Sequence, residues 1–287
     1  METLKQHEYF PSTDSVVSIL VRSPQTTFPE HIHEFDELVI ARSGSGMNYI
    51  DGNPSPICRG SVFYIRANQT HFLDRLDDLH LTNVLILPSR FRHVSYETIA
   101  KLMESSCGED NYYPHVIGGS TLKRVESLLN QISDESENGK GFPNLLVELL
   151  IGQLMFQLWR GQSEKTVDQE EKDDRLTRIL RYLNCHCDEE IDWDLLAARF
   201  GISLRSLNRK ITDITGMSPS SYLLRIRLCH SMHMLRRTDK SVTDIAYTCG
   251  FSNGSYFSSL FHREVGMTPM KFRNNASAIA SSRPMLN

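Results

Sequence analysis

The chain has 287 residues, of which 40% are hydrophobic and 23% charged, and its formal net charge is −4. This is the composition of a globular protein of about two domains. No apolar run approaches the roughly 20 residues that cross a bilayer, and the first residues lack a secretion-signal pattern. Six scattered cysteines without such a signal argue against a disulfide framework. We therefore expect a cytoplasmic protein with no membrane partner.

The small net charge hides an asymmetry between the two parts of the chain. Residues 1–170 carry 14 Lys and Arg against 23 Asp and Glu, whereas residues 195–287 carry 13 against only 4. An acidic front joined to a basic back indicates nucleic-acid binding by the back. A basic face that is merely solvated explains the same charges, so charge alone leaves both interpretations open.

Short strands are predicted over residues 28–90, where β-branched and aromatic runs are interrupted by Gly, Asn and Pro and Asp51-Gly52-Asn53 is a strong hairpin-turn signal. Helices are predicted over residues 121–134, where apolar residues recur at spacings of three and four, and 142–160, which is apolar on most sides. The second helix packs in the core or also contacts a second copy of the chain. The polar stretch 160–174 suits a linker.

Everything after this stretch is predicted to be helical. The sequence CHCDEE at residues 185–190 offers thiols, an imidazole and carboxylates that could hold a metal ion, but no second paired cluster accompanies it. We therefore favour the end of a helix as its interpretation.

One pattern occurs twice in the helical part. GISLRSLNRKITDITGMSPSSYL at residues 201–223 and GFSNGSYFSSLFHREVGMTPMKF at residues 250–272 share their apolar positions, with one extra residue in the second copy. Each copy predicts a short helix, a turn at Gly201 or Gly250, and a second helix, because a glycine after a helix takes the left-handed conformation cheaply. This is the plan of a helix-turn-helix motif.

Side-chain caps are predicted at the helix starts of both copies. Asp192 and Ser241 suit the N-caps of the two first helices, and Asp244 follows Ser241 by three residues, as in a capping box. Ser203 and Ser252 are the expected caps of the two second helices.

The outward faces of the two second helices differ. In the first copy, Arg205, Asn208 and Arg209 share the face opposite the apolar positions. Arginine usually reads guanine and asparagine reads adenine, so these three residues are our candidates for base contacts. The second copy lacks arginine on this face and is expected to bind DNA weakly, through shape or phosphate contacts. Its outward residues are Asn253, Gly254, Ser255 and Ser259.

A long helix is predicted between the copies, over residues 218–238, with Ser218 as N-cap and Pro219 at the first helical position. About 20 helical residues span roughly 30 Å, close to the ~34 Å between successive major-groove openings on one face of DNA. The helix therefore predicts a spacer between two reading heads. Arg225 and Arg227 are expected to neutralise phosphates, which makes binding weaken with salt.

The stretch SVTDIAYTCGFSNGSYFSSLFHREVGMTPMKFR, residues 241–273, resembles the signature of the AraC/XylS transcription regulators. The resemblance covers about residues 175–273 and implies a seven-helix DNA-binding domain. Activators of this family stand next to RNA polymerase. Asp244 is therefore our candidate for a contact with the sigma factor, and plain helix capping is the alternative.

The front part carries HIHEFDELVIARSG at residues 31–44 and GSVFYIRANQTH at residues 60–71, which resemble the two motifs of cupin β-barrels. The first motif places its ligand-type residues at one strand parity and therefore on one face. Such a set suits a divalent transition metal, hydrogen bonds to sugar hydroxyls, or contacts that only satisfy one another in the core. Our candidate ligand-binding residues are His31, His33, Glu37, Tyr64 and His71. We assign no metal, with His31, His33, Glu37 and His71 as the set that would hold one.

Further stretches resemble the L-rhamnose operon activators of the same family, among them FPEHIHEFDELVIARSGSG at residues 28–46, LTNVLILPSRF at 81–91 and EIDWDLLAARFGISLRSLNRKIT at 190–212, and the similarity runs over most of the chain. It implies a homodimer that binds L-rhamnose as effector, needs no other cofactor, is not an enzyme, and activates rhamnose-utilisation genes on double-stranded DNA. A regulator of the same type answering another sugar or small molecule is the alternative. A metal-dependent cupin enzyme is more remote.

Together these observations predict an α+β chain of two domains. Residues 1–165 form a cupin-like β-barrel with helices for ligand sensing and dimerisation, and residues 166–174 form a linker. Residues 175–275 form an all-α domain with two helix-turn-helix motifs, and residues 276–287 form a flexible tail.

Overall fold

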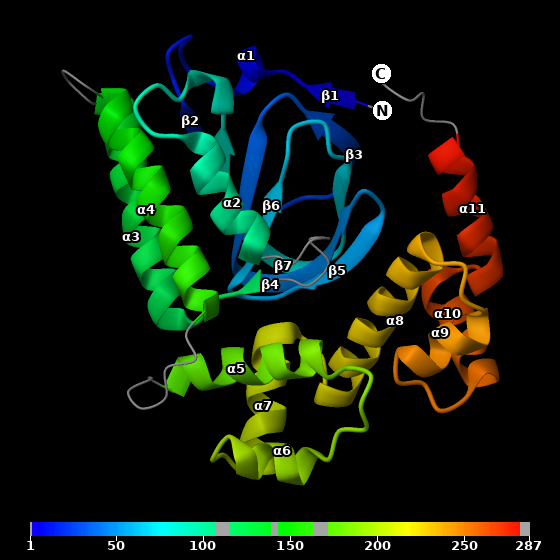
Figure 1. Ribbon diagram of the computed structural model, residues 1–287. Coiled ribbons are helices and arrows are strands. Elements are labelled where there is room, and N and C mark those ends of the chain that lie inside the picture. Colours follow the sequence, from blue (N-terminus) through cyan, green and yellow to red (C-terminus); the bar gives the residue numbers. More distant parts are fainter. Residues whose placement is uncertain (1, 107–114, 139–142, 164–171, 282–287) are drawn as a thin grey trace. The chain divides into compact units, whose positions relative to one another are not determined.

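The computed structural model describes residues 2–106, 115–138, 143–163 and 172–281 (Figure 1). The chain forms two compact units. The first contains Met1–Arg181 with Asn208–Met217, and the second contains Tyr182–Leu207 with Ser218–Asn287. Most of the expected linker 166–174 lies outside the described residues.

An eight-stranded sheet dominates the described part of the first unit and confirms the predicted all-β region. β4 and β7 are its longest strands, and their antiparallel pairing runs from Asp36 opposite Ile86 to Ile50 opposite His71. The strands lie in the order β1-β3-β7-β4-β6-β8, with β2 paired to β7 and β5 paired to β4. Their bounds are β1 Glu2–Leu4, β2 Val17–Arg22, β3 Phe28–His33, β4 Asp36–Ile50, β5 Asn53–Ile57, β6 Ser61–Ile65, β7 His71–Ile86 and β8 His115–Val116.

A two-residue turn at Asp51 and Gly52 joins β4 to β5, as the sequence predicts. Both residues have positive φ, 49° and 74°, which is the backbone geometry of tight hairpin turns and the reason that Asp-Gly suits this position. The Asp51 carboxylate also accepts hydrogen bonds from the backbone N–H and the hydroxyl of Thr70, at 3.2 and 3.1 Å. The turn is therefore tied to the start of β7.

The side chains of β4 alternate between two environments. Leu38 and Ile40 belong to an apolar cluster that also contains Val84 and Ile86 of β7 and side chains of three helices. Figure 1 shows these helices beside the sheet. They are α2 (Tyr96–Ser106), α3 (Gly119–Asn138) and α4 (Pro143–Ser163), and α3 and α4 confirm the two helices predicted for this region. Two shorter helical segments are α1 (Gln6–Tyr9) and η1 (Pro88–Arg90).

A buried carboxylate fastens α4 to the segment that follows β7. Glu148 is fully buried, and its two oxygens accept hydrogen bonds from the backbone N–H groups of Arg92, His93 and Val94 at 2.7–2.9 Å. Hydrogen bonds to an ionised acceptor are stronger than those between neutral groups. Burial of this charge is therefore compensated by three donors that would otherwise lack a partner in this irregular segment.

From Lys172 onward the described residues form helices, which confirms the predicted all-α part. These are α5 (Lys172–Cys185), α6 (Trp193–Arg199), α7 (Leu204–Thr215), α8 (Pro219–Arg237), α9 (Val242–Thr248), α10 (Gly254–Val265) and α11 (Pro269–Ser281). α5 ends at Cys185, the start of the CHCDEE stretch, and α11 extends into the expected tail, of which residues 282–287 lie outside the described part. Over the described ranges, no helix combines the length and apolarity needed to cross a membrane.

The capping predictions are confirmed except at one position. Asp192, Ser218 and Ser241 accept hydrogen bonds from backbone N–H groups of the first turns of α6, α8 and α9. At α10 the cap is Asn253, whose Oδ1 accepts from Ser255 and Tyr256 N–H at 2.8 and 3.1 Å. The prediction of Ser252 is wrong because the extra residue of the second copy moves the helix start by one position.

Left-handed turns follow α6 and α9, where the two glycines of the repeat were predicted to end the helices. Gly201 and Gly250 have φ of 61° and 80°. A Cβ on Gly250 would lie 2.7 Å from the carbonyl oxygen of Asp188. Glycine is therefore required there by space as well as by backbone conformation.

We predict that His115→Gln reduces the acid sensitivity of the fold. Burial, with a smaller contribution from Arg181, lowers the pKa of the His115 imidazole to about 3, against about 6.5 in an unfolded chain. Below pH ~6.5 the unfolded chain binds a proton that the native state excludes, so the free energy of unfolding falls as the pH drops towards 3. Urea denaturation at about pH 7 and pH 5 should show a smaller pH-dependent loss for the variant than for the wild type. Equal losses would contradict this role of His115.

Candidate functional site

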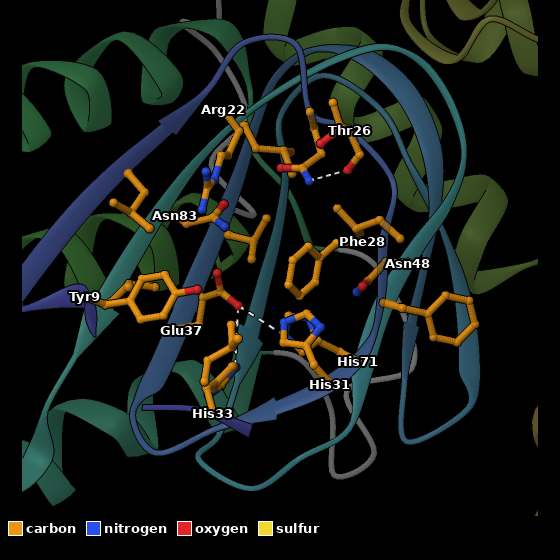
Figure 2. Close-up of a pocket in the computed structure, with 18 of the residues that line it drawn as sticks. Tyr9, Arg22, Thr26, Phe28, His31, His33, Glu37, Asn48, His71 and Asn83 are labelled. Carbon is orange, nitrogen blue, oxygen red and sulfur yellow. Dashed lines mark hydrogen bonds and ion pairs between the residues drawn. The ribbon is translucent and has the colours of Figure 1, made fainter. Parts of the chain in front are cut away.

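A cavity of about 470 Å³ lies on the side of β4 that carries Glu37 and Val39. Figure 2 shows side chains from several strands converging on it. Apolar side chains such as Phe28, Leu73 and Leu81 form part of its wall. The polar residues that line it include Tyr9, Arg22, Gln25, Thr26, His31, His33, Glu37, Asn48, His71 and Asn83.

Strand register explains why these polar side chains meet. Residues directly opposite in an antiparallel pair point to the same face. His31 of β3 lies opposite His71 of β7, and Val39 of β4 lies opposite Asn83 of β7. His33 is two residues from His31 and therefore shares its face. The structure thus brings together four of the five predicted ligand-binding residues, although the two cupin-like motifs are separated in sequence.

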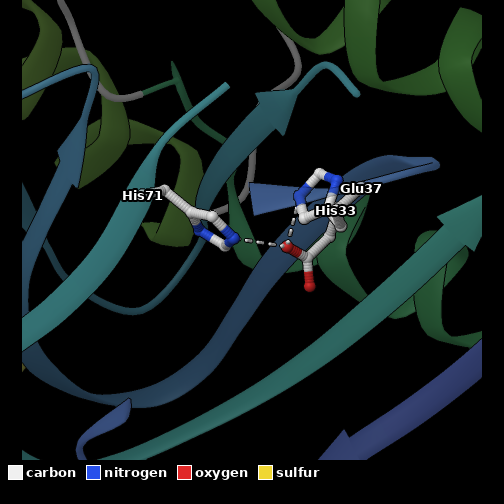
Figure 3. Close-up of side chains that lie close together, drawn as sticks. All are labelled: His33, Glu37 and His71. Carbon is white, nitrogen blue, oxygen red and sulfur yellow. Dashed lines mark ion pairs between the residues drawn. The ribbon is translucent and has the colours of Figure 1, made fainter. Parts of the chain in front are cut away.

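Three of these residues form a tighter group at one end of the cavity. The Glu37 Oε2 atom lies 3.5 Å from His33 Nε2 and 3.4 Å from His71 Nε2 (Figure 3). All three ligand-type atoms lie within 4.8 Å of one another. His31 is outside this group, and its ring stands against that of His71 with centroids 4.2 Å apart, while its Nδ1 hydrogen-bonds to the carbonyl oxygen of Pro29 at 2.8 Å.

Burial and neighbouring charges set the protonation of the group. Burial lowers the pKa of the His71 imidazole to about 3 and also holds the pKa of His31 below its usual value. Burial acts to raise the pKa of Glu37, but the adjacent imidazoles of His33 and His71 outweigh it and hold this pKa below the usual range. At neutral pH the cavity therefore contains an ionised carboxylate beside a neutral His71.

Several buried polar atoms in the cavity lack a hydrogen-bond partner within the described part of the chain. They are His33 Nε2, Glu37 Oε2, Asn48 Oδ1 and Nδ2, His71 Nε2 and Asn83 Oδ1. Buried polar atoms in proteins nearly always have partners. Their convergence on one hollow indicates a site for a ligand that offers both donors and acceptors.

Sequence reasoning missed Asn48 and Asn83. Both stand among apolar residues of long strands, at the parity that faces the cavity: Asn83 lies opposite Val39, and Asn48 is only 1% exposed. A polar amide inside an otherwise apolar strand was the available signal, because such a group is costly unless it binds something.

Tyr64 does not line the cavity, which corrects our prediction for this residue. It lies opposite Leu38 in the β4–β6 pair and so faces the helices rather than the histidines. Its hydroxyl donates a hydrogen bond to Asp36 at 2.6 Å, and Tyr96 of α2 donates to the same carboxylate oxygen at 2.7 Å. Tyr64 is therefore part of the attachment of α2 to the sheet.

The predicted DNA-reading face of α7 is exposed. Arg205, Asn208 and Arg209 are exposed, whereas Leu207 and Ile211 are fully buried. This alternation is the amphipathic pattern that leaves one helix face available to a partner. The face carries two guanidinium groups and an amide, which are donors suited to base edges and phosphates.

The corresponding face of α10 carries fewer side-chain groups that could contact DNA bases. Asn253, Ser255 and Ser259 are exposed as predicted, but the side-chain Oδ1 of Asn253 accepts the N-cap hydrogen bonds of its own helix. Tyr256 is also exposed, with 53% of its surface accessible, and sequence reasoning did not single it out. An aromatic ring with a hydroxyl can contact sugar and phosphate groups, so the face of α10 suits backbone contacts.

Arg225 and Arg227 have partners inside the helical part, and their contact with DNA phosphates stays a prediction. Arg227 is half-buried and donates hydrogen bonds to the backbone oxygens of Cys187 and Glu189, both at 2.6 Å. Arg225 lies 3.7 Å from the Glu264 carboxylate of α10. Both guanidinium groups therefore fix neighbouring segments to α8.

Asp244 is exposed at the start of α9, and its carboxylate accepts a hydrogen bond from the Ser241 hydroxyl at 2.7 Å. Its backbone N–H donates to the same Ser241 oxygen. The expected capping interaction is therefore present. Because the Asp244 side chain is exposed and a carboxylate can accept several hydrogen bonds, capping and a partner contact are compatible.

Comparison with known proteins covers both parts of the chain. A family model described as an AraC-like ligand binding domain matches residues 15–180, and one described as a helix-turn-helix domain matches residues 196–275. The first model covers more than half of the chain. Its span contains the complete cavity lining apart from two residues near the N-terminus, Leu4 and Tyr9.

Full-length relatives agree with these matches. The chain is 38% identical, over 97% of its own length and 99% of the relative's, to the "HTH-type transcriptional activator RhaS" of Enterobacter sp. (strain 638). It is 36% identical, over 96% and 99%, to the protein of the same name from Yersinia pseudotuberculosis serotype I (strain IP32953). A solved AraC-type regulator from Chromobacterium violaceum is 32% identical, covers 36% of this chain and 91% of its own, and has a TM-score of 0.34. Since both family models match and these relatives align over nearly the entire chain, the chain belongs to the AraC family of DNA-binding transcription regulators, as a RhaS-like activator.

Proposed function

We propose that this chain senses L-rhamnose in the cavity of its first unit and activates rhamnose-utilisation genes. The observation that carries the proposal is the set of buried, unpartnered polar atoms of Asn48, Asn83 and the histidine group. Sugar hydroxyls both donate and accept hydrogen bonds, so they suit amide and imidazole groups together. The name of the full-length relatives supports rhamnose as the sugar.

The wall of the cavity fits a deoxy sugar in particular. L-rhamnose carries a methyl group where most hexoses carry a hydroxymethyl group. Apolar residues such as Phe28, Leu73 and Leu81 share the lining with the polar set. Burial of a methyl group against such a wall lowers the free energy of binding, because apolar surface leaves water. A hydroxyl group in the same place would lose a hydrogen bond to water.

On the DNA side, we place base reading on α7 through Arg205, Asn208 and Arg209, with α10 in a supporting role. α8 has 19 residues and is therefore about 28 Å long, which suits two motifs in successive major grooves. Residues 1–165 act as sensor and 175–275 as DNA-binding domain, joined by 166–174. Asp244 is the proposed contact with the sigma factor of RNA polymerase.

A second copy of the chain is the proposed partner of α4. The residues exposed along one stripe of this helix are spaced by three and four, and three of them are large and apolar: Leu146, Leu149 and Phe156, with 42%, 52% and 43% of their surfaces accessible. This spacing is that of a seam between two packed helices. A homodimer through this face accounts for their exposure.

We predict that Asn83→Leu weakens sugar binding. The variant keeps the size of the side chain but removes its amide, so binding should weaken by about 1–3 kcal/mol. Isothermal titration calorimetry with L-rhamnose, and with other hexoses for comparison, measures the change. Asn144→Ala, which alters an amide on α4 bonded to the Asp14 carbonyl oxygen, is the control and should bind as the wild type does. Tighter binding of another sugar would replace rhamnose as the effector, and no binding of any sugar would refute the proposal.

Arg205→Ala and Arg209→Ala should each weaken specific DNA binding by about 1–3 kcal/mol, because each removes a charged donor aimed at the duplex. Gel-shift titration on DNA selected from genomic fragments, with and without L-rhamnose, measures the loss. Lys123→Ala on α3, an exposed charge outside the two helix-turn-helix copies, serves as the matched control. If affinity is unchanged in both arginine variants, α7 is not the reading helix.

Leu149→Asp should shift the protein from dimer to monomer, because it places a charge at the centre of the proposed seam. Sedimentation velocity over micromolar concentrations distinguishes the two states. Ser127→Asp adds the same charge to an exposed position of the neighbouring α3 and should leave the dimer intact. A dimer that persists in the Leu149 variant would place the interface elsewhere.

A further inference from the structure

We propose that His33, Glu37 and His71 hold a divalent transition-metal ion at one end of the cavity. The three side chains come from β3, β4 and β7 and point toward one another in Figure 3. The inference concerns a metal of the sensor cavity; only its connection with sugar rests on the proposed function.

The distances from the Glu37 oxygen to the two imidazole nitrogens fit a shared ion. Metal bonds to imidazole nitrogen and carboxylate oxygen are about 2.0–2.2 Å long, so two donors on one ion are roughly 3–3.5 Å apart at tetrahedral or octahedral angles. Glu37 Oε2 lies 3.5 Å from His33 Nε2 and 3.4 Å from His71 Nε2. None of these three atoms has a hydrogen-bond partner among the described residues.

The tautomer of His33 makes a direct hydrogen bond to Glu37 unfavourable. His33 Nδ1 is hydrogen-bonded to the backbone carbonyl oxygen of Phe35, which can only accept, so Nδ1 carries the proton. In a neutral ring, Nε2 then presents a lone pair to Glu37. Two acceptors then face each other across the gap, and a metal ion or a proton between them makes the arrangement favourable. A backbone carbonyl on the far ring nitrogen is also the usual second partner of a metal-binding histidine.

Burial of the Glu37 carboxylate calls for a compensating positive charge close to it. The side chains of His33, Glu37 and His71 are 1%, 6% and 8% exposed, and an ionised carboxylate without compensation is costly at such depth. A neutral imidazole is the form that binds metal. The group therefore offers one carboxylate and two imidazoles as donors in a buried position.

The donor set also indicates the class of metal and its use. Two imidazoles and one carboxylate suit zinc and the divalent ions of manganese, iron, cobalt or nickel, rather than calcium or magnesium. Three protein ligands leave coordination positions open. The donor atoms line the same cavity as Asn48 and Asn83, so those positions face the ligand space, where hydroxyl groups of a bound sugar would complete the coordination.

The test is titration of chelator-treated, full-length protein with Co²⁺ alone, followed by visible d–d absorption and by equilibrium dialysis. We expect one Co²⁺ per chain with ligand-field bands of a nitrogen–oxygen site. Glu37→Gln and His71→Gln should each reduce the affinity at least tenfold. His7→Gln, an exposed histidine of α1, should not. Circular dichroism and gel shift verify that each variant is folded.

Absence of d–d bands in the wild type, or equal Co²⁺ affinity in wild type and both ligand variants, would overturn the metal site and leave a proton shared by His33 and Glu37 as the compensating charge. Calorimetry with L-rhamnose on chelated and Co²⁺-loaded protein separates the two proposals. Sugar binding without Co²⁺ binding refutes the metal alone, whereas Co²⁺ binding without sugar binding refutes the proposed effector and leaves the metal site standing.

Discussion

The first unit depends on the pairing of β4 with β7, because this pairing decides which side chains face the cavity. Along β4, Leu38 and Ile40 enter the apolar cluster under the helices, while Glu37 and Val39 face the cavity. A slip of one residue would exchange the two sets and bury Glu37 among leucine and valine side chains. The positive-φ turn at Asp51 and Gly52, tied to Thr70, fixes the chain at the far end of the same pairing. The register of β4 against β7 therefore determines both which side chains line the cavity and which ones pack in the apolar core.

The two helix-turn-helix copies show how one backbone plan serves two different surfaces. Glycine ends the first helix in both, and a side-chain cap begins the second. In the first copy the outward face of the second helix is left to arginine and asparagine. In the second copy Asn253 is both the N-cap of α10 and a candidate for a base contact. Its side-chain Oδ1 accepts hydrogen bonds from the backbone N–H groups of Ser255 and Tyr256. The start of α10 therefore uses a side-chain oxygen for capping that would otherwise face outward.

Periodicity and turn chemistry predicted the strands, the helices and most caps, because these depend on residues near in sequence. The same parity argument placed His31, His33 and Glu37 together, and the second motif brought His71. Tyr64 was misassigned because its partner, Asp36, is distant in the sequence. The partners of Arg225 and Arg227, such as the Cys187 carbonyl oxygen for Arg227, could not be predicted for the same reason. Hydrogen bonds of that range depend on how elements pack. Asn48 and Asn83 escaped notice because only the register across β4 and β7 reveals which face they share.

The attachment of Glu148 has a mechanical consequence. β7 supplies cavity residues such as His71 and Asn83, and the chain that leaves its end is held by one α4 carboxylate through three backbone N–H groups. Hydrogen bonds to a charged acceptor contribute about 1.5–3 kcal/mol each, so separating the two pieces is far more costly than moving them as a unit. The segment that follows β7 is therefore mechanically coupled to α4, the helix whose other face exposes Leu149 and Phe156.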